Sequence, residues 1–245
     1  MRNPTGTPVP ASNSQNYHLD VHTTLDRIFH SPVKLNTQTW FRAEDAAALG
    51  RIRLRRGQDD FQKIYRFTQE GVYRRQREPH DRLEAQLTPA QWTDVKETFY
   101  AYDLVRLGCP QVSEASLLIY IVSAAAISQR SESLSLCVFG KRQLHWVRLR
   151  ADRLAPLEVS YVAQTQEAAN RKNGTVKALR IALETQPLDS ELDEVENFSF
   201  LGFQKEIAID IDPTSRIPLH ASGIIPGVGK VSLALREVRL KPATE

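Results

Sequence analysis

Alternation of apolar and polar residues with a period of two runs through most of this chain and restricts its fold more than any other feature. In "GRIRLRRG", for example, Arg51 and Arg53 fall on one face and Ile52 falls on the other. The same alternation fills the segments 60–76, 134–150, 157–164, 174–184 and 205–222. At least seven strands with short connections follow from it. The sequence therefore predicts a mainly β fold, an antiparallel meander that curves into a barrel or half-barrel.

Turn-forming residues separate these segments. Glu70–Gly71, Gly140–Lys141 and Asp212–Pro213 each predict a turn between two paired strands. Asn173–Gly174 is a strong turn dipeptide and predicts the end of a polar loop, just before the next strand. The alternation changes phase near Arg236–Glu237, which predicts a β-bulge in the last strand.

Two segments favour helix, so we expect one or two short helices beside the sheet. "VSEASLLIYIVSAA" has Ser113 as a candidate N-cap, Glu114 in the first turn, and a body that is apolar nearly all round. A helix of that composition should be buried against the sheet. "TPAQWTDVKETFYAY" has Thr88 as a candidate cap and Pro89 in the first turn, although its aromatic end also suits a strand.

Neither a repeat nor a linker divides the chain after its first residues. Residues 1–16 contain three prolines and no apolar stretch, so we expect a flexible leader there. A removed export signal, replaced by a methionine, would leave the same kind of start. Residues 17–245 are expected to form a single β-rich domain. The longest uncharged run, 115–129, is shorter than the roughly 18 residues that cross a bilayer, so no transmembrane segment is predicted.

The stretch "SGIIPGVGKVSL" resembles a phosphate-binding loop at first sight. Such a loop needs a glycine five positions before its second glycine, a hydroxyl residue after the lysine, and then a helix. Ile224 and Val231 occupy those two positions, and the residues that follow alternate as in a strand. We therefore interpret the glycines as a turn before the last strand, and we predict no nucleotide site and no cofactor.

No spacing in the chain matches a catalytic or metal-binding motif. His18 and His22 flank Asp20, but further metal ligands are missing, so we interpret them as solvated histidines. His145 and His220 alternate with apolar residues, which predicts buried histidines whose polar atoms are satisfied. The sequence thus predicts no catalytic residue and no metal site.

Cys109 and Cys137 are the two cysteines of the chain. They form either a disulfide or two buried free thiols. A disulfide between them would stabilise the fold by about 3 to 4 kcal/mol on the chain-entropy model, and export to an oxidising compartment would favour it. A hydrolytic enzyme assembled in space around Cys109 or His145 is a further alternative, which nothing in the spacing favours.

Arginines cluster on the early strands. Arg51, Arg53 and Arg55 share one face of their strand, and Arg74 lies on a following strand. The wider group also contains Arg56, Arg75 and Arg77, with Tyr65, Phe67 and Tyr73 interleaved. Three interpretations stay open: an inert solubilising surface, a face for anionic lipid or polymer, and a face for single-stranded nucleic acid. The net charge of +3 gives no reason to expect a nucleic-acid partner.

Three stretches in a fixed order resemble a family of uncharacterised bacterial envelope proteins, the DUF3108-like group. They are "SEASLLIYIVSAA", "ESLSLCVFGKRQLHWVRLR" and "IDIDPTSRIPLHASGIIPGVGKVSLALREV", and together they span about residues 110 to 240. The resemblance implies an exported β-rich protein whose sheet curves into a barrel-like shape. It carries over no catalytic residues.

We therefore expect a non-catalytic protein of the bacterial envelope, in which a curved sheet with an apolar inner face binds a lipid or another apolar ligand. The alternative is an interaction module that binds an anionic polymer or a protein partner through its basic face, and salt dependence distinguishes the two. We expect a monomer with at most peripheral envelope contact. It would lie in the periplasm or cell envelope if a signal peptide has been removed, and otherwise in the cytoplasm.

Overall fold

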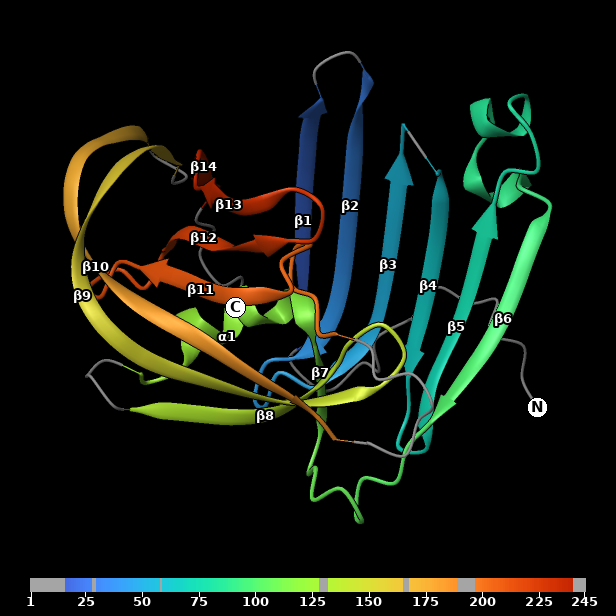
Figure 1. Ribbon diagram of the computed structural model, residues 1–245, viewed down its shortest axis with the longest axis horizontal. Helices are drawn as coiled ribbons and strands as arrows, with labels where there is room; N and C mark the ends of the chain where they lie inside the picture. The colour runs from blue at the N-terminus through green and yellow to red at the C-terminus, as the bar shows by residue number, and fades with distance from the viewer. Residues whose placement is uncertain are drawn as a thin grey trace. The chain divides into compact units, whose positions relative to one another are not determined.

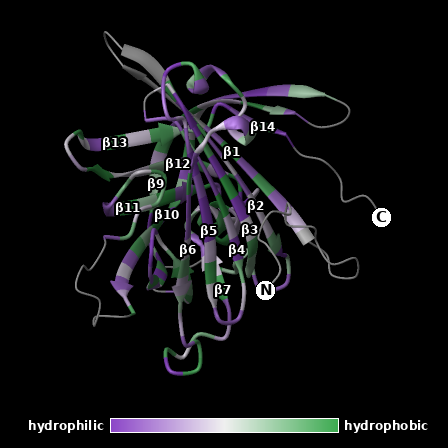
Figure 2. Cartoon of the chain, turned by 90° about the vertical axis from the view of Figure 1, so that its right-hand side faces the viewer, coloured by the Kyte–Doolittle hydropathy of each residue, from purple (hydrophilic) through white to green (hydrophobic). Residues whose placement is uncertain are grey.

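The computed structural model describes residues 16–27, 30–57, 59–127, 132–164, 168–188 and 197–239. Its described part is mainly β, with antiparallel sheets and one short α-helix, as the alternation predicted (Figure 1). Hydrophilic and hydrophobic residues alternate in bands along the strands (Figure 2). The chain divides into two compact units, Met1–Leu117 with Cys137–Leu144, and Leu118–Leu136 with His145–Glu245. Residues 1–15 of the expected leader lie outside the described residues.

The first unit contains a six-stranded antiparallel meander in which each strand pairs with the next along the chain. Its strands are β1 (Asn16–Arg27), β2 (His30–Arg42), β3 (Ala48–Arg56), β4 (Phe61–Phe67), β5 (Gly71–Glu78) and β6 (Asp94–Ala101). After this sheet, β7 (Val112–Glu114) pairs in parallel with Cys137–Phe139, the end of β8 (Ser133–Phe139).

The second unit contains a curved sheet in the order β13-β12-β11-β10-β9. Its strands are β9 (Leu144–Gln164), β10 (Ala169–Pro187), β11 (Lys205–Ile211), β12 (Pro218–Ile225), β13 (Gly229–Ala234) and β14 (Glu237–Arg239). The pair β9–β10 is long and strongly bent in Figure 1. β14 pairs in parallel with β9. The sheets curve, but they are not closed into a barrel.

The helix predicted in the segment 112–125 exists only in part. Residues 112–114 form β7, the 3-10 helix η3 spans Ala115–Leu117, and α1 spans Leu118–Ala124. Ser113 is therefore not an N-cap, because its backbone pairs with Val138 in the parallel ladder. α1 packs against β11 and β12 with Leu118, Ile121 and Val122 buried, as its composition predicted.

Arg216 holds the carboxyl end of α1. Its guanidinium donates hydrogen bonds to the carbonyl oxygens of Val122, Ser123, Ala125 and Ile127, at distances of 2.6 to 3.2 Å. The last carbonyls of a helix have no partner within the helix, and a cation there also interacts favourably with the helix dipole. One side chain from the loop before β12 thus completes the end of the helix.

The second predicted helix, over 88–102, is wrong beyond its first turn. The 3-10 helix η1 (Glu84–Gln86) precedes this segment. A second 3-10 helix, η2 (Pro89–Gln91), has Thr88 as its N-cap, and the capping box of Thr88 with Gln91 is present. The chain then continues as β6, which pairs with β5 from Gly71↔Ala101 to Glu78↔Asp94. Sheet pairing along eight residues outweighs the local helix signal, and the aromatic end is strand, as its composition also allowed.

Three of the predicted turns are confirmed and two local predictions are wrong. Turns lie at Glu70–Gly71, at Gly140–Lys141 and at Asp212–Pro213. Asn173–Gly174, however, lies inside β10, opposite Ser160 and Val159 of β9. No bulge occurs at Arg236–Glu237, because β13 ends at Ala234 and the chain leaves it to pair with β9 as β14.

A disulfide joins Cys109 to Cys137 within the first unit. Both residues are buried, and no free cysteine is present. The bond connects the loop before β7 to the strand that pairs with β7, so it closes a segment of chain with a sequence separation of 28 residues.

Replacing both cysteines, in Cys109→Ala/Cys137→Ala, should lower the free energy of unfolding by about 3.5 kcal/mol, because the unfolded chain loses a cross-link. Urea unfolding of the wild type with and without dithiothreitol measures the same quantity. The double variant is the control, and the reductant should leave its midpoint unchanged. A wild-type midpoint that ignores complete reduction would contradict the prediction.

Candidate functional site

The strand register places the arginines of the predicted basic face on one side of the first sheet. Arg51 lies opposite Tyr65, which lies opposite Arg74, while Arg53 lies opposite Lys63. Arg55, two residues after Arg53, shares this side. Residues directly opposite each other in an antiparallel pair point to the same face. We call the surface formed by Arg53, Lys63 and Arg74 the cationic cluster. The sequence reasoning missed Lys63, because only the register shows which β4 residue meets Arg53.

The other arginines of the group lie on the opposite side of the sheet and hold the connection between β5 and β6. Arg56 donates to the carbonyl oxygens of Ala85 and Leu87, at 2.7 and 2.9 Å. Arg77 donates to the carbonyl oxygens of Ala90 and Trp92, at 2.8 and 3.2 Å. Tyr73 also lies on this side, opposite Arg66. These arginines therefore have structural partners.

Arg51 is bound by a buried carboxylate that the sequence reasoning placed in a helix. Its Nη1 lies 2.7 Å from Oε2 of Glu114, and the two side chains are 5% and 0% exposed. Thr39 donates to Oε1 of Glu114 at 2.8 Å, and the Ser116 hydroxyl also hydrogen-bonds to it. The Arg51 guanidinium lies over the Tyr65 ring at 4.0 Å. Arg51 is thus bound in a buried polar network, although its Nε has no hydrogen-bond partner among the described residues.

Electrostatics within this network favour both charged forms. Burial by itself would raise the pKa of Glu114, but the charge of Arg51 and the hydrogen bond from Ser116 outweigh it, so the pKa lies below its ordinary value. Burial would lower the pKa of Arg51, but Glu114 raises it overall. The network is therefore an ion pair at neutral pH.

Replacing Glu114 in Glu114→Gln should destabilise the protein by about 3 to 5 kcal/mol, because it leaves the Arg51 charge buried without a counterion. A depressed carboxyl pKa gives stability that is present above the unfolded pKa, about 4.3, and is lost as the pH falls through the folded pKa. The variant should lack that part of the acid dependence in urea unfolding.

Glu97→Gln is the matched control for that measurement. Glu97 pairs with Arg75 at 3.5 Å but is 54% exposed, so its loss should cost less than about 1 kcal/mol. Equal effects of the two substitutions would contradict a special role of the buried pair.

His145 and Cys109, the candidates for an enzyme assembled in space, do not form a reactive site. The sulfur of Cys109 is in the disulfide, so it is no nucleophile while that bond is intact. His145 is 1% exposed and its ring lies edge-on to Phe198 at 5.3 Å. Its Nε2 has no hydrogen-bond partner in the described part of the chain, so the expected satisfied histidine is buried but not satisfied. Burial lowers the pKa of His145 to about 4.

His145 should make the protein less stable in mild acid. The unfolded chain binds a proton near its ordinary pKa of about 6.5, whereas the folded chain does so only near 4. The free energy of unfolding should therefore fall by about 2 kcal/mol between pH 7 and pH 5 through this residue. His145→Phe should flatten the pH dependence of the urea midpoint, and His80→Gln, an exposed control, should leave it. A slope that His145→Phe does not change would contradict the assignment.

A polar cluster crosses three strands of the second sheet. Arg180 of β10, Asp210 of β11 and His220 of β12 lie in one cross-strand row. Nδ1 of His220 lies 2.8 Å from Oδ2 of Asp210, and Arg180 lies 3.4 Å from Oδ1. Arg180 also donates to the Ser222 hydroxyl at 3.0 Å. Nδ1 of His220 thus has a partner, but the residue is half-buried rather than buried as the sequence predicted. Ser222 lies outside this row, opposite Ala208.

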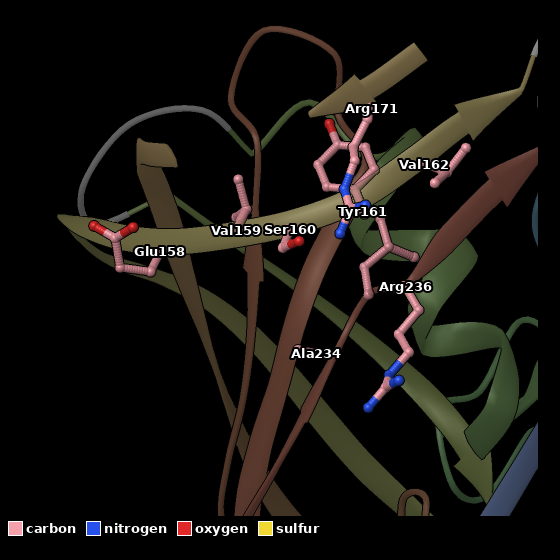
Figure 3. Close-up of a pocket in the computed structure, with 9 residues that line it drawn as sticks. Glu158, Val159, Ser160, Tyr161, Val162, Arg171, Ala234 and Arg236 are labelled. Carbon is pink, nitrogen blue, oxygen red and sulfur yellow. The ribbon is translucent and has the colours of Figure 1, made fainter. Parts of the chain in front are cut away.

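A cavity of about 610 Å³ lies beside the C-terminal part of the second sheet (Figure 3). Its lining comes from β9, from Arg171 of β10 and from the segment 234–236 that leaves β13. The β9 residues are Glu158, Val159, Ser160, Tyr161 and Val162. Tyr161 is 7% exposed and belongs to an apolar cluster with Ala178 and Leu219. Burial raises the pKa of Tyr161, so its phenol is neutral. No sequence pattern predicted this cavity, because it forms where the chain returns from β13 to β9.

Arg171 and Arg236 add positive charge to a mixed lining, in which Glu158 and Ser160 are polar and the remaining side chains are mostly apolar. Neither side chain forms an ion pair within the described residues. Partly buried apolar residues surround the cluster beneath them: Leu157, Val159, Ala163, Val176, Ile217, Leu235 and Val238. The apolar cluster around Tyr161 with guanidinium groups in the same lining suits a molecule that has both an apolar part and an acidic group.

No family model, no curated protein and no solved structure matches this chain. The resemblance to the DUF3108-like group therefore stays a prediction. Within the described ranges, no helix is long and apolar enough to cross a membrane. The same residues contain no group of three or more histidine, cysteine or acidic side chains that could hold a metal ion.

Proposed function

We propose that this protein is a non-catalytic binding protein of the bacterial cell envelope, and that the cavity of its second sheet holds a lipid or another apolar molecule with an acidic group. The single observation that carries the proposal is the cavity itself, with Tyr161 and its apolar cluster on one side and the returning segment 234–236 on the other.

The size and chemistry of the cavity support this class of ligand. A volume of about 610 Å³ lies within the range of roughly 300 to 1,000 Å³ of small-molecule sites. Each buried CH₂ group of an acyl chain would contribute about 0.8 kcal/mol. Arg171 and Arg236 provide forked, permanently charged donors that match a carboxylate or phosphate. Arg171 projects from β10, and Arg236 from the segment that leaves β13.

The disulfide supports a place in the envelope. Disulfides form and persist in oxidising compartments such as the bacterial periplasm and are rare in the cytosol. Cys109–Cys137 is buried and joins two segments far apart in the chain. The resemblance to an exported family points the same way.

The proposal predicts that the pure protein retains envelope lipids. After incubation with a lipid extract and gel filtration, mass spectrometry should find lipid with the wild type. Val159→Glu places a charge in the cavity lining and should reduce the retained lipid at least about tenfold, a cost of about 1.4 kcal/mol in binding. Val228→Glu, a charge on a 68% exposed residue, should retain lipid as the wild type does.

Two further measurements keep the test independent of folding. Raising the salt concentration should hardly change the retention of neutral lipids, because apolar burial does not release counterions. Arg236→Gln should reduce the retention of acidic lipids more than that of neutral ones. A wild type that retains no lipid, or equal losses in Val159→Glu and Val228→Glu, would refute the proposed function.

A further inference from the structure

We propose that the cationic cluster of the first sheet, Arg53, Lys63 and Arg74, is a binding site for a phosphate group. This site lies in the first unit, and the cavity proposed to hold a lipid lies in the second. The two proposals can therefore be tested independently. Each of the three side chains is partly exposed, which allows an ion from solution to reach it.

The register brings the three side chains within reach of one anion. Arg53 of β3 and Lys63 of β4 are directly opposite, which puts their Cβ atoms about 5 Å apart. Arg74 of β5 lies opposite Tyr65 and therefore diagonal to Lys63, at about 7 to 8 Å. Long side chains from such positions can converge on one tetrahedral oxyanion, the arginines as planar forks and the lysine as a point charge.

None of the three has a carboxylate partner in the described part of the chain. Arg53 forms no ion pair or hydrogen bond there, and the Lys63 ammonium lies over the Phe61 ring at 4.3 Å. Arg74 donates to the Thr98 hydroxyl at 3.2 Å, but its Nε is buried without a partner. By contrast, other arginines of this sheet have acidic partners: Arg55 with Asp59, Arg56 with Asp60 and Arg75 with Glu97.

The carboxylates near the cluster are already engaged. Glu114 is bound by Arg51, Thr39 and Ser116. Glu78, whose charge also acts on Lys63, accepts a hydrogen bond from Gln76 at 2.5 Å. Glu78 keeps its charge, because the Gln76 amide is neutral, but one carboxylate offsets only part of the charge of the three cations.

The titration behaviour of the cluster agrees with this excess. Burial, and then the charges of Arg53 and Arg74, lower the pKa of Lys63. Burial and the neighbouring Arg51 lower the pKa of Arg53. The pKa of Tyr65 is also lowered, although burial alone would raise it, because four surrounding cations favour the phenolate. Like charges held together cost stability unless a counterion offsets them, and local conflicts of this kind are typical of functional sites.

Isothermal titration with inorganic phosphate tests the site. The wild type should bind it, and Arg53→Gln and Lys63→Gln should each weaken binding at least about tenfold. Lys63→Arg should keep most of the affinity, because it keeps the charge. Arg66→Gln is the matched control, because Arg66 lies on the same strand as Lys63 but on the opposite side of the sheet, and it should bind as the wild type does.

Two outcomes distinguish the site from a structural one. Lys63→Gln should be at least as stable as the wild type in urea without phosphate, because it removes a like charge. Phosphate should raise the wild-type melting temperature and leave that of Lys63→Gln unchanged. A variant that is clearly less stable without phosphate would show a structural role and overturn the proposal.

The source of the phosphate group is resolved by a second arm. Vesicles of phosphatidylcholine with and without phosphatidic acid are sedimented with the wild type and with Lys63→Gln. Binding that needs both phosphatidic acid and Lys63 assigns the site to a lipid headgroup, whereas binding of inorganic phosphate alone assigns it to a free ion. Absence of both, or equal weakening by Arg66→Gln, would refute the proposal.

Discussion

The register of backbone hydrogen bonds between neighbouring strands decides which side chains of this protein meet. Arg53 faces Lys63, and Arg180 faces Asp210, only because the strands pair at these positions. Side chains alternate between the two faces of a strand, so a slip by one residue would move each to the other side. Both polar groupings come from residues far apart in the sequence. Strand pairing therefore determines which side chains form a cluster in each sheet, whereas the alternation of residue types determines only which side chains share a face of one strand.

Two arginines on one strand show how differently the same residue type is treated. Arg51 belongs to a buried network in which it forms an ion pair with Glu114, and Thr39 donates a hydrogen bond to the same carboxylate. Arg53 lies two residues further, faces the same way and has no acidic partner in the described part of the chain. A buried pair repays the desolvation of its charges only when its geometry and hydrogen bonds are good. Arg51 thus contributes to the packing of the 3-10 helix η3 after β7. The charge of Arg53 has no carboxylate partner in the described residues and is available to an anionic ligand.

The sequence predicted what depends on local patterns and failed where distant strands compete with them. Alternation identified most of the strands after β2, because a half-buried strand needs it, but it gave no prediction for β1 and β2, and β6 and β7 fell in predicted helices. The turn prediction at Asn173–Gly174 was wrong, because the long pairing of β10 with β9 keeps this dipeptide in a strand. The N-cap prediction at Ser113 was wrong for the same reason, because pairing with Val138 places this residue in a strand. Glu114 and Lys63 could not be recognised as members of their clusters, because only register and packing define those clusters.

The two proposed sites arise where the pairing of elements leaves a surface without its own partner. β9 pairs with β10 over most of its length, but β14 covers only three of its residues, Val162 to Gln164. The chain must leave β13 to reach that position, and the cavity proposed to hold a lipid lies beside this departure. In the first unit Glu114 pairs with Arg51 and Glu97 pairs with Arg75, whereas no carboxylate of the described residues forms an ion pair with the cationic cluster. The cavity thus depends on apolar surface that the path of the backbone leaves exposed. The cationic cluster depends on positive charge that no ion pair offsets, so apolar and anionic probes should distinguish the two sites.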